Sequence, residues 1–373
     1  MLFVKTEDLK PGMRLAKPIY NRNGVMLYER NSKITSQGII SVNNFGLIGI
    51  YILEPAEPVP PMSEDDIEFE RFKAMSIFEI KEILDAYSAG NTENNMYQFI
   101  NQLLKNYGSL HHKINFIQNI RSNDDYVYKH SLNTAILCAL ISSRLGLEFK
   151  TQLDLTAAAL LHDIGGLQIP NNIRRKKTID QTMEEEKKIT MCYQNSYDAF
   201  KANLDLSPDI KRILSAGLML LHPDIPSATE NVPKVIGAEI LKVANCFDNM
   251  TAMKFGDEPL SEIAAIRYLL EMEDQFDRKI VDALLDSINV LSPGVCVEFT
   301  NGDKGLVVTA NDSNVLEPFV LSFKDNKLYN LADSKVAEQM KIKDIMKTMD
   351  NRHVVDREFL SQYKGKTLHM GEK

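Results

Sequence analysis

Apolar residues recur every three or four positions through the middle of the chain, from about residue 65 to residue 291. The runs FERFKAMSIFEIKEILDAY and SEIAAIRYLLEMEDQFDRKIVDALLDSINVL carry this spacing and contain no proline. A period near 3.6 residues places apolar side chains on one face of a helix, where other helices can cover them. The pattern therefore predicts a helical domain built around one hydrophobic core.

The segments on either side of this region have the alternating pattern and turn residues of short β-strands. Before it, Pro11-Gly12 and Asn23-Gly24 are turn signals, and Leu47–Leu53 is an apolar strand candidate. After Ser292-Pro293-Gly294, apolar and polar residues alternate again around Asn301-Gly302, a dipeptide typical of hairpin turns. We therefore predict a mainly α fold, in which a helical bundle is flanked by two small β-rich modules.

Proline content sets the boundary between the first two units. EPAEPVPP, which runs from Glu54 to Pro61, is too rich in proline for a helix and favours extended backbone, so it is interpreted as a linker. The predicted order is a β-rich module at 1–53, a Pro-rich linker at 54–64, a helical domain at 65–291, a second β-rich module at 292–345 and a polar tail at 346–373.

The overall composition is that of a globular protein, with 44% apolar and 25% charged residues. A formal net charge of -8 argues against DNA binding, because contacts with phosphates need an excess of Lys and Arg. The basic run Arg174–Lys177 is short and is interpreted as a solvated loop. The cysteines form no CxxC pair, and no stretch is apolar enough to span a membrane, so we expect a cytoplasmic protein.

Three residues in the helical region have the chemistry of metal ligands. His130 lies on the apolar face of a predicted helix and therefore points inward; taken alone, it is typical of a hydrogen-bonded core histidine. His162 and Asp163 are adjacent, at the end of the apolar run LDLTAAALL and just before Gly165-Gly166. Such a pair offers a metal ion one nitrogen and one carboxylate oxygen, and the glycines let backbone and ligands approach closely.

These residues sit in runs that resemble a known family. YVYKHSLNTAILCALISSRLGL, LDLTAAALLHDIGGLQIPNNI and ILKVANCFDNM are similar to the HD-GYP family of bacterial cyclic di-GMP phosphodiesterases, within the HD phosphohydrolase superfamily. The resemblance extends from about Asp124 to Met250, so that the HD core is expected at about 119–255. LKPGMRLAKPIYNRNG and LSPGVCVEFTNGDKGLVV also resemble the small β modules that often flank HD-GYP domains. The implied fold is an HD-type helical bundle.

The family pattern also includes residues that this chain lacks. Gly166 stands where the family has a lysine that contacts the scissile phosphate, and Tyr193 falls on or near the position of a further histidine. Leu221 replaces the first of two paired histidines, of which only His222 remains, and the GYP signature is absent. Asn245 replaces an aspartate, and a neutral amide is a weaker ligand than a carboxylate for a hard divalent ion.

What remains implies a reduced metal site. The resemblance implies one divalent ion, Mn or Fe, held by His130, His162, Asp163 and His222, and it is equally compatible with no metal. If the site is active, Asp163 is the catalytic residue. Asp248, one helical turn beyond the replaced aspartate, is a second candidate carboxylate, although a packing or capping role is the simpler interpretation. We expect His130, His162 and Asp163 to converge in space.

The leading hypothesis is therefore a degenerate HD-GYP-like signalling protein that binds cyclic di-GMP or a protein partner without efficient hydrolysis. One alternative is a metal-dependent cyclic di-GMP phosphodiesterase with a reduced or rearranged metal site. Another is a metal-free interaction scaffold similar to the HDOD domains. The partners implied are a cyclic dinucleotide or a signalling protein, and a homodimer is also left open.

Overall fold

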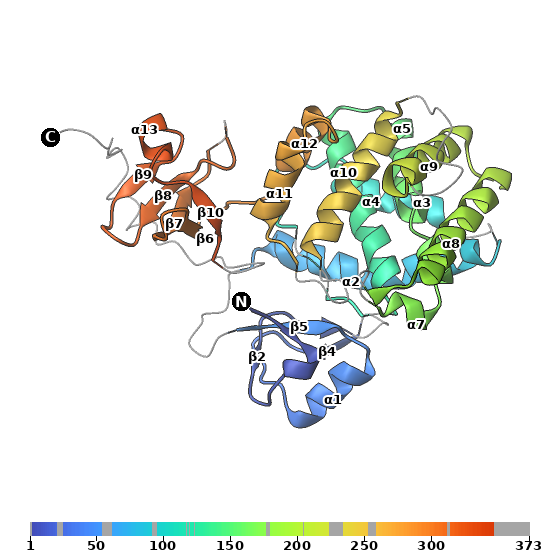
Figure 1. Cartoon of the computed structure of the whole chain (residues 1–373), viewed down its shortest axis with the longest axis horizontal. Helices are drawn as coiled ribbons and strands as arrows, with labels where there is room; N and C mark the ends of the chain where they lie inside the picture. Colours follow the sequence, from blue (N-terminus) through green and yellow to red (C-terminus); the bar gives the residue numbers. More distant parts are fainter. Residues whose placement is uncertain are drawn as a thin grey trace.

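A computed structural model describes residues 2–20, 25–53, 62–91, 95–116, 118, 120–122, 124–176, 180–203, 205–223, 234–252, 259–311 and 314–346. The predicted turn at Asn23-Gly24, the Pro-rich stretch 54–61, Lys177 and the end of the polar tail lie outside these residues. Figure 1 shows a large helical region with one small β-containing module at each end of the chain.

Helices dominate the middle of the chain, as the apolar spacing predicted. They are α2 (Glu64–Ser88), α3 (Met96–Tyr107), α4 (Tyr126–Arg144), α5 (Phe149–Leu161), α6 (Gly165–Gln168), α7 (Asn171–Arg174), α8 (Met183–Ala202), α9 (Pro208–Leu221), α10 (Ile236–Thr251), α11 (Glu262–Glu271) and α12 (Arg278–Leu285). The prediction of a mainly α fold of the HD type is confirmed. Among the described helices, none is both long and apolar enough to cross a membrane.

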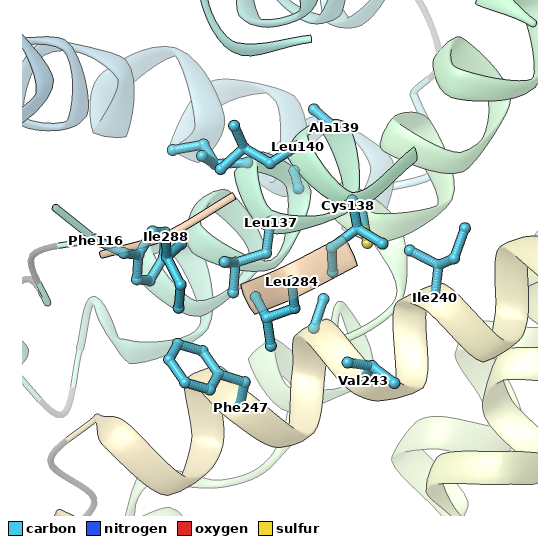
Figure 2. Packing of buried hydrophobic residues seen from close by; sticks show 14 of the residues in the cluster. Phe116, Leu137, Cys138, Ala139, Leu140, Ile240, Val243, Phe247, Leu284 and Ile288 are labelled. Carbon is cyan, nitrogen blue, oxygen red and sulfur yellow. The ribbon is translucent and has the colours of Figure 1, made fainter. Parts of the chain in front are cut away.

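Helix α4 is the centre of this bundle. All of its residues from His130 to Ser142 are buried, so this stretch of the helix has no solvent-exposed face. Side chains of α4, α10 and α12 meet in one cluster, in which Leu137 and Cys138 face Val243, Phe247 and Leu284 (Figure 2). A polar side chain on α4 is therefore held inside the protein and needs hydrogen-bond partners there.

The N-terminal module combines short antiparallel strands with one helix. Strands β1 (Leu2–Lys5), β5 (Gly49–Leu53) and β2 (Arg14–Leu15) form a sheet in that order, and β3 (Ile19–Tyr20) pairs with β4 (Met26–Tyr28). The strand expected at 47–53 is β5. Helix α1 (Ser36–Asn44) lies in a region for which only strands and turns were predicted; its N-cap is Thr35, whose hydroxyl accepts a hydrogen bond from Gly38 N.

The C-terminal module is a five-stranded antiparallel sheet in the order β10-β6-β7-β8-β9. Its strands are β6 (Cys296–Phe299), β7 (Lys304–Thr309), β8 (Phe319–Ser322), β9 (Leu328–Asn330) and β10 (Ile342–Ile345), with the short helix α13 (Ser334–Ala337) between the last two. The Asn301-Gly302 dipeptide connects β6 to β7, and Gly302 has a φ of 82°, a conformation that favours glycine. The predicted hairpin is thus present.

Both modules contact the helical region. Leu47 forms a β-bridge with Ser122, and the backbone N–H of Ile48 donates to the carbonyl oxygen of Arg121 at 3.3 Å. At the other end, the Ser261 hydroxyl before α11 donates to the carboxylate of Asp344 on β10. The division of the chain into separate domains at the boundaries given above remains a prediction.

Candidate functional site

His130 is oriented by a carboxylate from a neighbouring helix. Its side chain is 2% exposed, and its Nδ1 lies 2.6 Å from Oδ2 of Asp248, which α10 carries. An ionised carboxylate can only accept hydrogen bonds, so Nδ1 bears a proton and donates it. The opposite nitrogen, Nε2, points to the amide oxygen of Asn245, also on α10, at 2.8 Å.

His162 faces the same point from the end of α5. Its Nδ1 lies 2.7 Å from the carbonyl oxygen of Ala159, which again makes Nδ1 the donor. Its Nε2 lies 3.2 Å from Nε2 of His130 and 3.1 Å from Oδ1 of Asn245. Burial, followed by the neighbouring His130, lowers the pKa of His162 to about 4. At neutral pH this imidazole is therefore uncharged, with a lone pair on Nε2.

Three electron-pair donors thus converge: Nε2 of His130, Nε2 of His162 and Oδ1 of Asn245. They repel one another unless a positive charge lies between them. A metal cation at this point would remove the repulsion. Ligands about 2.1 Å from one ion at right angles to each other lie about 3 Å apart, close to the separations seen here. Donation of each Nδ1–H to an oxygen is also how metal-binding histidines are oriented. The residues therefore fit one cation.

Asp163 has a different neighbour. The phenol of Tyr193, on α8, donates to Oδ1 of Asp163 at 2.7 Å, and the tyrosine ring stacks on His222 with ring centroids 3.9 Å apart. Burial, followed by the charge of Asp163, raises the pKa of Tyr193 well above its usual value, so the phenol keeps its proton. Tyr193 thus contacts both of the other predicted ligands, Asp163 and His222.

Among the described residues, no group of three or more His, Cys, Asp or Glu side chains is placed to hold a metal ion. The donors that meet are two histidines and an amide, and an amide does not belong to that set. The structure brings His130 and His162 together with Asn245. It places His222 at the end of α9, against the ring of Tyr193.

Asp248 belongs to a buried polar network that sequence reasoning missed. Arg121 donates to both of its oxygens, at 2.6 and 2.8 Å, and both side chains are fully buried. Asn133 and Gln118 donate to Oδ1 of Asp248 at 2.8 and 3.1 Å. Burial opposes ionisation, but Arg121 and the hydrogen bond from His130 hold the pKa of Asp248 well below its usual range. This carboxylate orients His130 from the side opposite Nε2.

Gly165 and Gly166 bring α6 close to α8. A Cβ on Gly165 would lie 2.7 Å from Cδ1 and 2.9 Å from the backbone Cα of Tyr193, and one on Gly166 would lie 3.0 Å from Cγ2 of Val127. The contact of Gly165 with Cα of Tyr193 involves the backbone, which cannot rotate away as a side chain can. Residue 165 must therefore be glycine if Tyr193 is to reach Asp163.

Gly165→Ala is expected to lower the free energy of unfolding by about 1–2 kcal/mol, because the steric cost of overpacking exceeds the gain in helix propensity. Urea denaturation of both proteins measures the difference. Gln168→Ala, an exposed change on the same short helix, is the matched control and should leave stability nearly unchanged. Equal stability of Gly165→Ala and the unmodified protein would contradict the close packing of α6 on α8.

Comparisons with known proteins identify similar sequences. Residues 115–280 match a family model described as an HD domain. Over 198 residues the chain is 26% identical to the cyclic di-GMP phosphodiesterase PdeB of Borreliella burgdorferi, covering 52% of each protein. Over 232 residues it is 23% identical to a cyclic di-GMP phosphodiesterase of Pseudomonas aeruginosa, covering 61% of this chain and 53% of the relative. The chain therefore spans about half the length of these curated relatives.

A solved structure, of an HDG"Y"P protein from Bdellovibrio bacteriovorus, is similar with a TM-score of 0.46 and 12% sequence identity. The similarity covers 76% of this chain and 98% of that one.

Proposed function

We propose that this chain is an HD-GYP-type signalling protein that binds cyclic di-GMP without hydrolysing it efficiently. The choice of ligand follows from the names of the two curated relatives, both cyclic di-GMP phosphodiesterases. The loss of hydrolysis follows from the residues at the site. The observation that carries it is the phenol of Tyr193, which donates to Asp163 and covers His222.

Two-metal hydrolysis uses two ions about 3.5–4 Å apart, which together stabilise the attacking water and the phosphate. A carboxylate commonly bridges them, and Asp163 is the residue for that role here. In this chain one oxygen of Asp163 accepts a hydrogen bond from a neutral phenol. The neighbouring positions Gly166 and Leu221 offer no ligand atoms in their side chains. The second ion would therefore have too few ligands.

A single ion, in contrast to two, would have enough ligands. His130, His162 and Asn245 would hold it, since their three lone pairs already converge. Such an ion would act as a Lewis acid on a phosphate oxygen. This convergence is also what favours the second candidate function, a phosphodiesterase with a single metal. The residues of the chain itself position the histidines: Asp248 and the carbonyl of Ala159 fix the two rings.

The expected metal content is at most one Mn or Fe ion per chain. Protein loaded with excess metal and passed through gel filtration would be measured by elemental analysis. His162→Ala should remove the ion, because two donors without a charged ligand bind weakly, whereas His111→Ala, an exposed histidine, should not. A content of zero would favour the metal-free interpretation of the convergent donors. Two ions per chain, or an ion retained by His162→Ala, would contradict the proposed site.

Binding is tested separately, by titrating cyclic di-GMP into the protein in a calorimeter. We expect saturable binding that leaves the dinucleotide intact on chromatography. No binding would contradict the proposed ligand and would favour the interaction scaffold instead.

A further inference from the structure

A cavity of about 390 Å³ lies between the N-terminal module and the helical region, apart from the paired histidines. Its walls come from residues 17–20 and from the end of α1 on one side, and from α2 and the start of α4 on the other. The α2 wall contains Lys73, Ala74, Ile77 and Lys81, spaced as one face of a helix. The volume lies within the range of about 300–1,000 Å³ that is usual for small-molecule sites.

Two of the lysines that line this cavity are buried. Lys73 is 2% exposed, and its Nζ lies 4.5 Å from the centre of the Phe69 ring. Lys17 is 6% exposed, and its Nζ donates to the carbonyl oxygen of Gln118 at 3.3 Å. Lysine is seldom buried, because removing an ammonium group from water is costly. Burial first, and then the charge of Lys17, lower the pKa of Lys73 well below its usual range.

The most buried ionisable side chains of the lining are both lysines, Lys17 and Lys73. Four lysines and three carboxylates line the cavity as a whole. Two of these residues form an ion pair with each other, since Nζ of Lys129 lies 2.6 Å from Oδ2 of Asp125 near the start of α4. Glu70 is the acid on the same helix face as Lys73. An anion bound beside Lys17 and Lys73 would favour the charged, protonated form of both side chains.

Apolar side chains form the rest of the lining. Ile19, Phe45, Ile77 and Ile120 lie around the cavity, and each would make contact with a hydrophobic body but not with a free inorganic ion. We propose that the cavity is a binding site for a small organic anion, whose acidic group lies at Lys17 and Lys73 and whose apolar body packs against these residues.

The position of the cavity gives its occupant access to the buried network. Gln118 lines the cavity, and its side-chain Nε2 donates to Thr251 at 2.8 Å and to Asp248 at 3.1 Å. Asp248 in turn holds His130. A bound anion is therefore separated from the paired histidines by two hydrogen-bonded side chains. Binding itself is independent of the metal content and of cyclic di-GMP, so it can be tested alone.

The probe is 8-anilinonaphthalene-1-sulfonate, an aromatic body with one sulfonate, titrated into the full chain by fluorescence and calorimetry. We expect one saturable site and a higher midpoint of thermal unfolding in its presence, since a ligand that binds the native state stabilises it. N-phenyl-1-naphthylamine, which lacks the sulfonate, should bind about tenfold more weakly. Lys73→Met should weaken binding of the sulfonate by a similar factor, whereas Lys105→Met, at an exposed position, should not.

Ala74→Trp is the second variant, because Ala74 is half-buried and an indole at this position would fill the cavity. Circular dichroism verifies that each variant is folded. If Lys73→Met does not fold, loss of binding in folded Ala74→Trp supports the proposal, and unchanged binding overturns it. The proposal is also overturned if the unmodified protein has no saturable site, or if the neutral probe binds as tightly as the sulfonate.

Discussion

Asp248→Ala is expected to lower the free energy of unfolding by roughly 3–5 kcal/mol, a large share of the stability of an ordinary domain. The reason is the set of buried hydrogen bonds that this carboxylate accepts. It accepts hydrogen bonds from Arg121 through both oxygens, and also from His130, Asn133 and Gln118. With the carboxylate gone, a fully buried guanidinium has lost its counter-charge in a place that water does not reach.

Urea denaturation followed by circular dichroism measures this loss. The matched control is Asp286→Ala, which removes an exposed carboxylate 3.8 Å from Lys113, and an exposed pair contributes about 0–1 kcal/mol. Asp248→Asn keeps the shape of the side chain but not its charge, and it should also destabilise. A loss below about 1 kcal/mol for Asp248→Ala would mean that the guanidinium reaches solvent after all.

No measurable hydrolysis of cyclic di-GMP is expected from the unmodified protein supplied with manganese or iron. Loss of one electrostatic stabiliser typically lowers the rate by about 10²- to 10³-fold. The resemblance to the family pattern implies that Gly166, Tyr193 and Asn245 each stand in place of a charged or metal-binding residue, and such losses would accumulate even if they are not additive. Release of the linear dinucleotide, separated by chromatography, is the measurement.

Asn245→Asp alone should not restore hydrolysis, although it should tighten manganese binding. A carboxylate at this position adds a negative charge beside the two Nε2 atoms, which favours a cation there. It does nothing for the second ion, because Tyr193 still donates to Asp163. Robust turnover by the unmodified protein, abolished by His162→Ala, would overturn this expectation and favour the single-metal enzyme.

The helices of the central region could be predicted from sequence because their apolar period is local and long. Helix α1 could not, since SQGIISVNN is short and its isoleucines and valine equally suit a strand. The pairing of His130 with His162 followed from the family motif and not from the spacing. The role of Arg121 had no local signal, because its partner is 127 positions away and it lies outside any regular element.

Tyr193 marks the limit of what the motif could predict. Comparison with the family pattern placed it on or near the position of a further histidine, and so predicted the loss of a ligand. Only the structure adds what the tyrosine does instead, which is to donate to Asp163 and to stack on His222. A residue that replaces a ligand can also occupy the space and the hydrogen-bond acceptor that the ligand left.

Gln118 links the N-terminal module to the buried network around Asp248. Its amide nitrogen donates to Asp248, its amide oxygen accepts from Arg121, and its carbonyl oxygen accepts from Lys17. The backbone of Arg121 and Ser122 is likewise tied to residues 47 and 48. Cutting the chain at the Pro-rich stretch would remove the groups that donate to the backbone carbonyl oxygens of Gln118 and Arg121, next to the network that holds His130. A shortened protein that keeps these two hydrogen bonds must include both Lys17 and Ile48.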